Sequence, residues 1–229
     1  MLTRPSFFEA SQFAFGAALA ERWADLHSEA RTILDRFLYL QFSNPELYVT
    51  RNAGVVGQRG MFYLVMAGMN VGGNRARCPH TCKALSHVPG LVNAAFYFLG
   101  PQAHILPHTG LCDRVLRAHL GLICPPDCAL RIGTEQRSWV DGELMVFDDT
   151  LEHEAWNRSE KWRAVLSFDF FFPATADPGV LDALAEMAIT QKPAERAWYA
   201  AAGLESPHPL PPAPGPIQAM VDAHGLYFC

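Results

Sequence analysis

The chain has 229 residues, of which 50% are hydrophobic and 18% charged, so it can bury a sizeable core. Its 18 basic and 23 acidic residues give a formal net charge of -5, which argues against nucleic acid or an anionic membrane surface as a partner. Because no apolar run approaches the roughly 18 to 20 residues that cross a bilayer, and no secretory signal begins the chain, we expect a cytoplasmic protein.

Residues 17–42 predict an amphipathic helix that lies on the domain. Its apolar residues recur at three- and four-residue steps, and the acidic residues largely fall elsewhere. The apolar stripe consists of Trp23, Leu26, Ala30, Ile33, Leu34, Phe37 and Leu38. Residues 44–82 follow with six glycines, several arginines and one strand candidate at residues 61–67. Such segments often form loops over a site.

The six cysteines are few for a disulfide scaffold in a chain of this length, so we expect reduced thiols. Two pairs have the spacing C-x3-C, Cys78 with Cys82 and Cys124 with Cys128. Zinc ribbons more often use C-x2-C pairs with turn glycines. The spacing therefore leaves a four-cysteine zinc site open but disfavoured.

From about residue 92 the pattern changes to short strands that are separated by turn residues. The strand candidates are VNAAFYFL (92–99), LRAHLGLI (116–123), ALRIG (129–133), ELMVFD (143–148) and WRAVLSFDFFF (162–172). Their spacing predicts an antiparallel sandwich or a small barrel.

Two of these strands place cationic groups on the face opposite their apolar residues. In residues 116–122, Arg117 and His119 share one face, and in residues 162–172 Arg163 does the same. A cation on a second face either meets water or points into a polar cavity, because its unpaired burial among apolar groups is costly. The barrel interior would be that cavity.

The C-terminal part, residues 174–229, is expected to be an extension that packs on the same domain as residues 1–173. Helical patterns occur near residues 178–191 and 193–202, and residues 206–216 form a proline-rich stretch that should be extended.

Two histidines lie in segments of loop-like composition, His108 in HILPHTG and His153 in FDDTLEHEAWN. Imidazole is the commonest side-chain ligand for transition metals, and its second nitrogen usually donates to a carboxylate or carbonyl. Acidic residues near His153, among them Asp149, are suitable acceptors. From the residues alone, histidines satisfied by neighbouring groups remain the alternative.

Residues 104–173 resemble the catalytic core of the aspartyl/asparaginyl β-hydroxylase family of iron(II)- and 2-oxoglutarate-dependent oxygenases. The matching pieces, in order, are PHTG, LRAHLGL, W-x2-GE, FDD-x2-EHE-x-W, WR and D-x3-P. With CPHTCKAL and the N-terminal helix, the resemblance covers roughly residues 17–173. It implies a mainly β fold with flanking helices, namely a double-stranded β-helix or cupin-like jelly roll.

The resemblance implies that His108 and His153 bind iron(II). Most related oxygenases add a carboxylate two residues after the first histidine. That position is Gly110 here, and the family resembled also lacks the acid and uses water in its place. Asp149 would then accept a hydrogen bond from this water; a solvated turn acid is the alternative.

The resemblance also implies residues that hold 2-oxoglutarate. The distal carboxylate of 2-oxoglutarate needs a charged, bidentate partner, for which Arg163 is the candidate. Arg117 and His119 resemble the family's donors to carboxylates near the metal. Tyr97 replaces a serine that supports the distal carboxylate, and its hydroxyl could substitute. For each arginine, the alternative is a surface ion pair of small energetic value.

The implied activity is the hydroxylation of an unactivated carbon in an amino-acid derivative, a peptide side chain or another small molecule. Dioxygen is the second substrate, and succinate and CO2 are the co-products. Vertebrate-type members have an arginine where this chain has Val115, which weakens the expectation of an acidic substrate side chain. Two alternatives stay open: a halogenase that uses the carboxylate-free iron, and a non-catalytic metal-binding cupin.

Overall fold

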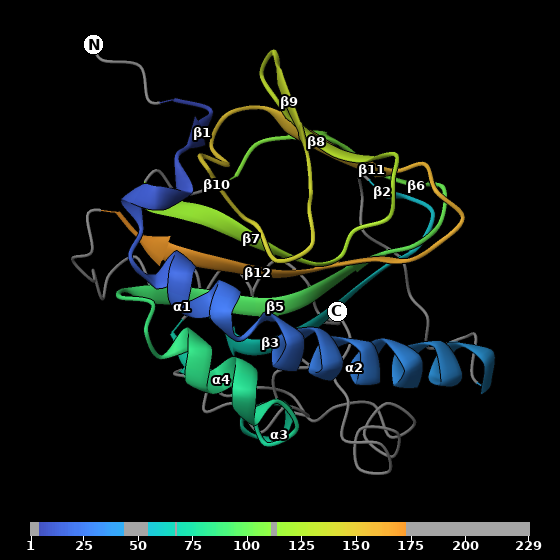
Figure 1. The fold of residues 1–229 in the computed structure, drawn as a ribbon. Coiled ribbons are helices and arrows are strands. Elements are labelled where there is room, and N and C mark those ends of the chain that lie inside the picture. Colours follow the sequence, from blue (N-terminus) through green and yellow to red (C-terminus); the bar gives the residue numbers. More distant parts are fainter. Residues whose placement is uncertain (1–4, 44–54, 67, 111–113, 173–229) are drawn as a thin grey trace, which may run out of the picture.

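Two antiparallel sheets form the body of the protein in the computed structural model, which describes residues 5–43, 55–66, 68–110 and 114–172 (Figure 1). The larger sheet contains, in spatial order, β1 (Phe7–Phe8), β10 (Leu144–Phe147), β7 (Val115–Ile123), β12 (Arg163–Phe171), β5 (Leu91–Leu99), β3 (Arg59–Met66) and β4 (Met69–Asn70). The smaller sheet contains β2 (Val55–Val56), β6 (Ala103–His108), β11 (His153–Asn157), β8 (Cys128–Ile132) and β9 (Glu135–Ser138).

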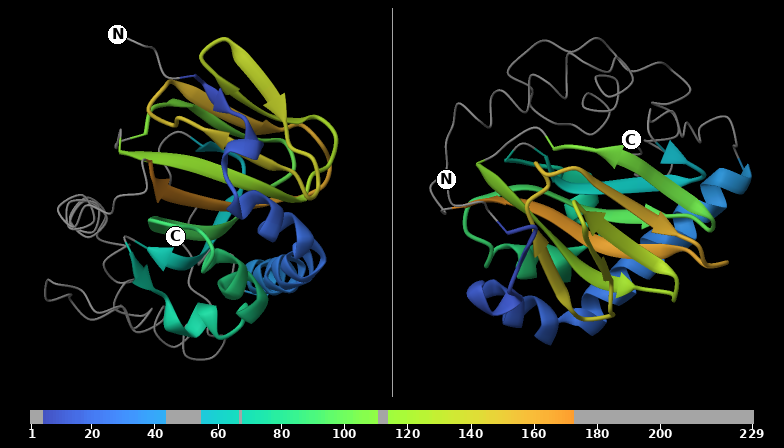
Figure 2. Two further views of the ribbon diagram at one scale, coloured as in Figure 1. Left: turned by 60° about the vertical axis from the view of Figure 1, so that its left-hand side comes forward. Right: turned by 90° about the horizontal axis from the view of Figure 1, so that it is seen from above.

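The chain passes repeatedly from one sheet to the other. From β6 to β8 and again from β10 to β12, consecutive strands alternate between the smaller and the larger sheet, and every strand pair is antiparallel. This alternation defines a double-stranded β-helix, so the predicted jelly-roll fold is confirmed. Figure 2 shows the two layers from two further sides.

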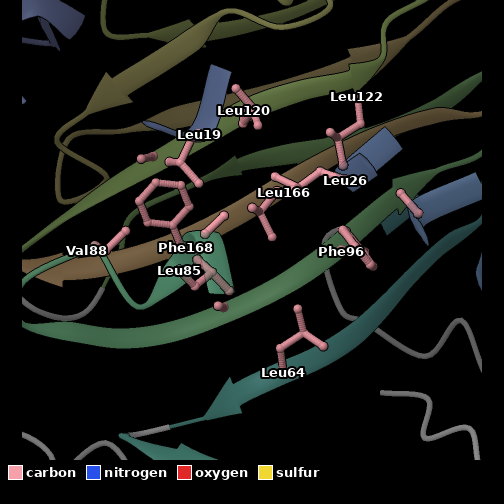
Figure 3. Packing of buried hydrophobic residues seen from close by; sticks show 14 of the residues in the cluster. Leu19, Leu26, Leu64, Leu85, Val88, Phe96, Leu120, Leu122, Leu166 and Phe168 are labelled. Atoms are coloured by element: carbon pink, nitrogen blue, oxygen red, sulfur yellow. The ribbon is translucent and has the colours of Figure 1, made fainter. Parts of the chain in front are cut away.

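Helices cover the outer face of the larger sheet (Figure 1). They are α1 (Phe15–Glu21), α2 (Trp23–Ser43), α3 (Gly72–Arg75) and α4 (Pro79–Leu85), with a 3-10 turn η1 (Ala10–Gln12) before them. Leu19, Leu26 and Leu85 of these helices pack against Leu120 and Leu166 of the sheet, all at most 1% exposed (Figure 3). This apolar layer is where the hydrophobic effect stabilises the fold.

A second buried cluster lies between the two sheets. Phe147 and Val165 of the larger sheet meet Ile105, Leu130 and Ala155 of the smaller one there. Because the apolar residues of β7 and β12 face the helices, the alternate residues of both strands face this interior. The predicted second faces therefore point into the barrel.

The predicted helix over residues 17–42 is two helices, because the chain leaves the helical conformation at Arg22. This residue has φ -101° and ψ 7°, and its N–H bonds the Leu19 carbonyl at 3.2 Å. Trp23 then begins α2, and its indole N–H donates to the Gly121 carbonyl of β7 at 2.9 Å. The break lets both helices press their apolar faces on the same sheet, with Leu26 fully buried.

The predictions for residues 174–229 lie outside the described residues. None of the helices in the described ranges combines the length and the apolar character that a membrane-spanning helix needs.

Candidate active site

The two histidines singled out by the sequence lie next to each other at the end of the smaller sheet. His108 of β6 and His153 of β11 are cross-strand partners, and their ring centroids are 4.2 Å apart. In each ring, Nδ1 lies 2.8 Å from a carbonyl oxygen two residues earlier, of Leu106 and Leu151 respectively. When Nδ1–H donates to the carbonyl, Nε2 carries the lone pair of the neutral ring and is the nitrogen that can bind a metal.

Both histidines belong to strands, although their segments have a loop-like composition. The pairing of His153 with His108 is followed by that of Ala155 with Ile105, so β6 has an extra residue at this point. Pro107 lies inside this β-bulge, where its missing N–H interrupts the ladder. The bulge accounts for the loop-like composition around His108, whereas His153 is the first residue of β11 and follows a turn at residues 149–150.

Burial keeps His153 neutral. Its side chain is only 4% exposed, and desolvation, aided by the charges of His108 and Arg117, lowers its pKa to about 4. A neutral imidazole can coordinate a metal at neutral pH. His108 is exposed, so the histidine pair lies where the barrel interior meets solvent.

Asp149 lies beside this pair and is buried, with an exposed fraction of 3%. Its Oδ2 pairs with Arg117 Nη1 at 3.1 Å, whereas the buried Oδ1 has no hydrogen-bond partner in the described part of the chain. A Cβ on Gly110 would collide with this carboxylate. The alternative that Asp149 is a solvated turn acid is therefore wrong.

Arg117 is held by two carboxylates of the chain itself. Its Nε and Nη2 donate to Asp169 at 2.7 and 3.0 Å, and Asn93 donates to the same carboxylate at 2.9 Å. Asp149 binds the third nitrogen. We had expected Arg117 to face carboxylates of the ligand, but its guanidinium already has acceptors. The sequence analysis included Asp169 in the motif D-x3-P but assigned it no role, although its place on the second face of β12 was a usable signal.

Arg163 lies fully buried inside the barrel. Its Nη1 donates weakly to the Tyr97 carbonyl at 3.4 Å, and its Nε and Nη2 have no hydrogen-bond partner within the described ranges. The guanidinium carbon lies 4.5 Å from the Trp139 ring centroid and 5.5 Å from that of Tyr97. Burial lowers the pKa of Arg163 from its ordinary value, but a guanidinium remains charged.

Tyr97 approaches Arg163 through its ring and its carbonyl. The hydroxyl, which we had expected to support a carboxylate, accepts a hydrogen bond from Arg59 Nη1 at 2.8 Å. That role of the hydroxyl stays a prediction.

His119 is buried between Arg163 and the histidine pair. Its Nδ1 accepts a hydrogen bond from Trp139 Nε1 at 3.2 Å, and its Nε2 is buried without a hydrogen-bond partner among the described residues. Phe147 packs edge-on against it, with centroids 5.0 Å apart, and also lies 6.3 Å from His153. Thus one continuous set of contacts connects Arg163 to the candidate metal ligands.

The described residues contain no group of three or more histidine, cysteine or acidic side chains that could hold a metal. Cys78, Cys82, Cys124 and Cys128 are free thiols. The four-cysteine zinc site that the spacing left open is therefore absent from this part of the chain, and a metal at the barrel mouth would have two imidazoles as its protein ligands.

The fold and the convergence of these side chains in its interior define a cupin-like jelly-roll protein. A family model described as "Aspartyl/Asparaginyl beta-hydroxylase" matches residues 20–173. The chain belongs to this family.

Curated relatives agree with this membership. An "Ornithine lipid ester-linked acyl 2-hydroxylase" of Rhizobium tropici is 31% identical over 175 residues, which are 75% of this chain and 62% of that protein. The human "Aspartyl/asparaginyl beta-hydroxylase" is 27% identical over 68% of this chain and 21% of its own length. The human "Aspartate beta-hydroxylase domain-containing protein 2" is 33% identical over 69% of this chain and 47% of its own length. The chain thus spans less than two thirds of each.

Solved structures resemble this chain more distantly. A crystal structure described as a predicted oxalate decarboxylase from Thermotoga maritima has a TM-score of 0.37 and 13% identity, and the match covers 52% of this chain and 84% of that one. A cupin domain of a transcriptional regulator from Enterobacter cloacae has a TM-score of 0.30 and 16% identity, over 34% of this chain and 80% of that one. The fold assignment rests on the strand order described above.

Proposed function

We propose that this chain is an iron(II)- and 2-oxoglutarate-dependent dioxygenase that hydroxylates an unactivated carbon. The observation that carries the proposal is the buried Arg163, whose Nε and Nη2 have no partner within the described ranges. Burying an unpaired cation costs several kcal/mol, and aromatic rings offset only about 2 kcal/mol of such a cost. An anionic ligand that enters the barrel would supply the missing acceptors.

His108 and His153 would hold the iron through their Nε2 atoms, because each Nδ1 is hydrogen-bonded to a backbone carbonyl. When bound, iron(II) with 2-oxoglutarate supplies the activation of dioxygen that oxidises the substrate and releases succinate and CO2. The two imidazoles would be the ligands that the chain itself supplies. The buried Oδ1 of Asp149, which has no hydrogen-bond partner among the described residues, would accept a hydrogen bond from water at this site.

Arg163 would bind the distal carboxylate of 2-oxoglutarate by a bidentate interaction. His119, which lies between Arg163 and the metal ligands, would donate a further hydrogen bond from Nε2 to the same cosubstrate. Tyr97 lines this side of the barrel. Both polar ends of the cosubstrate would then have partners without the rearrangement of any strand.

The first substrate candidate is an amino-acid derivative, a peptide side chain or another small molecule. Arg117, which would otherwise attract an acidic group, is already bound to Asp169 and Asp149, and Val115 replaces the neighbouring family arginine. These two features favour a neutral or cationic group over an acidic one near Arg117.

A second substrate candidate is a molecule with an acyl chain. Leu106 and Leu151, which flank the two candidate metal ligands, are 37% and 36% exposed, and the Rhizobium relative is named for an acyl chain of a lipid. Exposed apolar side chains at a site entrance favour an apolar ligand. An acyl substrate from a lipid would conflict with our expectation that the chain has no membrane partner. That expectation stays a prediction, and so do the cytoplasmic location and the absence of a nucleic-acid partner.

The test is succinate formation by the wild-type chain and by His108→Ala and His153→Ala, with iron(II), 2-oxoglutarate and dioxygen. We expect each variant to lose at least about a hundredfold in turnover and most of its metal affinity. His104→Ala is the matched control, because His104 lies on the same strand and pairs with Glu154 outside the site. Equal turnover by all four proteins would refute the assignment of the metal ligands.

The same assay separates the two alternatives. A halogenase would give a halogenated product when chloride or bromide is added. A non-catalytic cupin would form no succinate with any substrate, and iron(II) with 2-oxoglutarate would give no visible charge-transfer band in the absence of air.

A further inference from the structure

Trp139 contacts both His119 and Arg163, each of which has buried nitrogen atoms without a hydrogen-bond partner among the described residues. It follows β9 and is only 5% exposed, as part of the cluster between the sheets. Its indole N–H donates to His119 Nδ1 at 3.2 Å, and its ring face lies 4.5 Å from the guanidinium carbon of Arg163. One side chain therefore contacts both candidate donors to an anion.

The contact with Trp139 determines which nitrogen of His119 carries the proton. An indole N–H can only donate, so Nδ1 must accept and Nε2 must be protonated in the neutral ring. The ring is neutral because burial, followed by the charges of Arg163 and Arg117, lowers the pKa of His119 well below its ordinary value. His119 thus presents an N–H, at Nε2, that is buried and lacks a partner among the described residues.

The same indole stabilises Arg163 without occupying its donors. A carboxylate or carbonyl in this place would take up the N–H groups of the guanidinium, whereas a ring face attracts the cation through its quadrupole. Nε and Nη2 of Arg163 accordingly stay free for a ligand in the barrel.

We propose that Trp139 is a positioning residue that prepares the His119 Nε2–H and the Arg163 guanidinium to bind one anionic cosubstrate together. The proposal rests on the proposed function for the identity of that anion, 2-oxoglutarate. The arrangement is preorganised, because both donors are oriented before the anion arrives and little rearrangement opposes binding.

The first test needs no ligand. Nitrogen-15 NMR of the histidines in the full wild-type chain at neutral pH should show His119 with a protonated Nε2 and with Nδ1 as a hydrogen-bonded acceptor. In Trp139→Phe, which keeps a ring face but has no N–H, Nδ1 should lose the chemical shift of a hydrogen-bonded acceptor. The opposite tautomer or a charged ring in the wild type would overturn the proposal, whatever the variants do.

The second test measures the Kd of 2-oxoglutarate by calorimetry, with manganese(II) in place of iron so that no turnover occurs. We expect Trp139→Phe to raise Kd roughly three- to tenfold, because His119 is no longer oriented. Trp139→Leu, which also removes the ring face from Arg163, should raise it on the order of a hundredfold. Trp156→Phe is the matched control. Trp156 is also buried, and the guanidinium carbon of Arg158 lies 4.7 Å from its ring centroid, but this arginine and this tryptophan are separate from the Arg163–Trp139–His119 contacts.

The outcomes distinguish the two proposals. If the wild type binds no 2-oxoglutarate but shows the expected His119 tautomer, and Trp139→Phe changes it, the proposed function fails and the positioning role of Trp139 stands. If Trp139→Phe weakens binding while the His119 Nδ1 signal is unchanged, or if Trp156→Phe weakens it equally, Trp139 acts only through general packing and the positioning role is refuted.

Discussion

Gly110 shows how a single missing side chain shapes the candidate metal site. Most related oxygenases carry an acidic ligand at this position, but here the space is filled from another part of the chain. The Gly110 N–H donates to the Asp149 carbonyl at 2.6 Å, and a Cβ on Gly110 would overlap the Asp149 carboxylate. The glycine is required for this close approach of Asp149.

We therefore expect Gly110→Ala to displace the Asp149 carboxylate and to lower turnover at least about tenfold. Even a small displacement of a group beside the reacting atoms lowers the reaction rate strongly. Succinate formation and the manganese(II) Kd measure the effect. Gly133→Asn is the control: Gly133 has φ +55°, which asparagine tolerates, and nothing lies within 4 Å of its Cβ position. Turnover of Gly110→Ala equal to that of the wild type would show that Asp149 can move freely.

At the scale of elements, α2 organises its neighbours beyond its apolar face. Glu29 lies outside the predicted apolar stripe, and its carboxylate accepts hydrogen bonds from the backbone N–H groups of His80 and Thr81, each at 2.9 Å. It also accepts one from the Thr81 hydroxyl at 2.6 Å. These N–H groups begin α4, and Cys78, the residue before that helix, offers no side-chain cap. The cap of α4 thus comes from α2.

Glu29→Ala should lower the free energy of unfolding by about 1 to 2 kcal/mol, because it leaves the start of α4 without its acceptor. Urea denaturation measures this change. Asp35→Ala is the control on the same helix, since the Asp35 side chain is 58% exposed and pairs with Arg31 at the surface. Its loss should cost at most about 0.5 kcal/mol. Equal effects of the two substitutions would contradict the capping role.

At the scale of the whole molecule, stability and proposed chemistry belong to opposite faces of the larger sheet. The face beneath the helices is apolar, whereas the face inside the barrel carries Arg117, His119, Arg163 and Asp169, all buried or half-buried. The burial of these polar groups inside the barrel opposes folding unless they are paired. A ligand that pairs them would stabilise the protein by mass action.

The metal-free protein should lose stability as the pH falls. Burial lowers the pKa of His119 well below its ordinary value and that of His153 to about 4. A histidine in the unfolded chain has a pKa of about 6.5. The unfolded chain therefore binds more protons in this window, so stability is complete above about pH 6.5 and is lost as the pH falls toward 4. The loss from His153 alone corresponds to about 3 kcal/mol.

Thermal melting of the metal-free chain between pH 7 and 5 tests this expectation. The melting temperature should fall with pH in the wild type and less steeply in His119→Gln and His153→Gln. His80→Gln serves as the control, because the His80 side chain is 55% exposed. If both buried variants kept the wild-type slope, the buried imidazoles would not be the source of the pH dependence.

The sequence by itself determined the strand-rich class, the inward faces of β7 and β12, and the residue types available for chemistry. Alternation along a strand and the spacing within a motif are local properties, so they can be read without the fold. The same local pattern gave both histidines a loop-like setting, because a β-bulge with a proline has the composition of a turn near His108 and because His153 follows a turn.

Only the tertiary structure decided which of these residues meet. Arg117 and Asp169 are 52 residues apart in the chain, and Trp139 and His119 are 20 apart. Their contacts follow from the register of β7 against β12 and from the packing of one sheet on the other. A shift of one residue in that register would turn every side chain of a strand to the other face. Register depends on the burial of the whole apolar face, which no short segment of sequence contains.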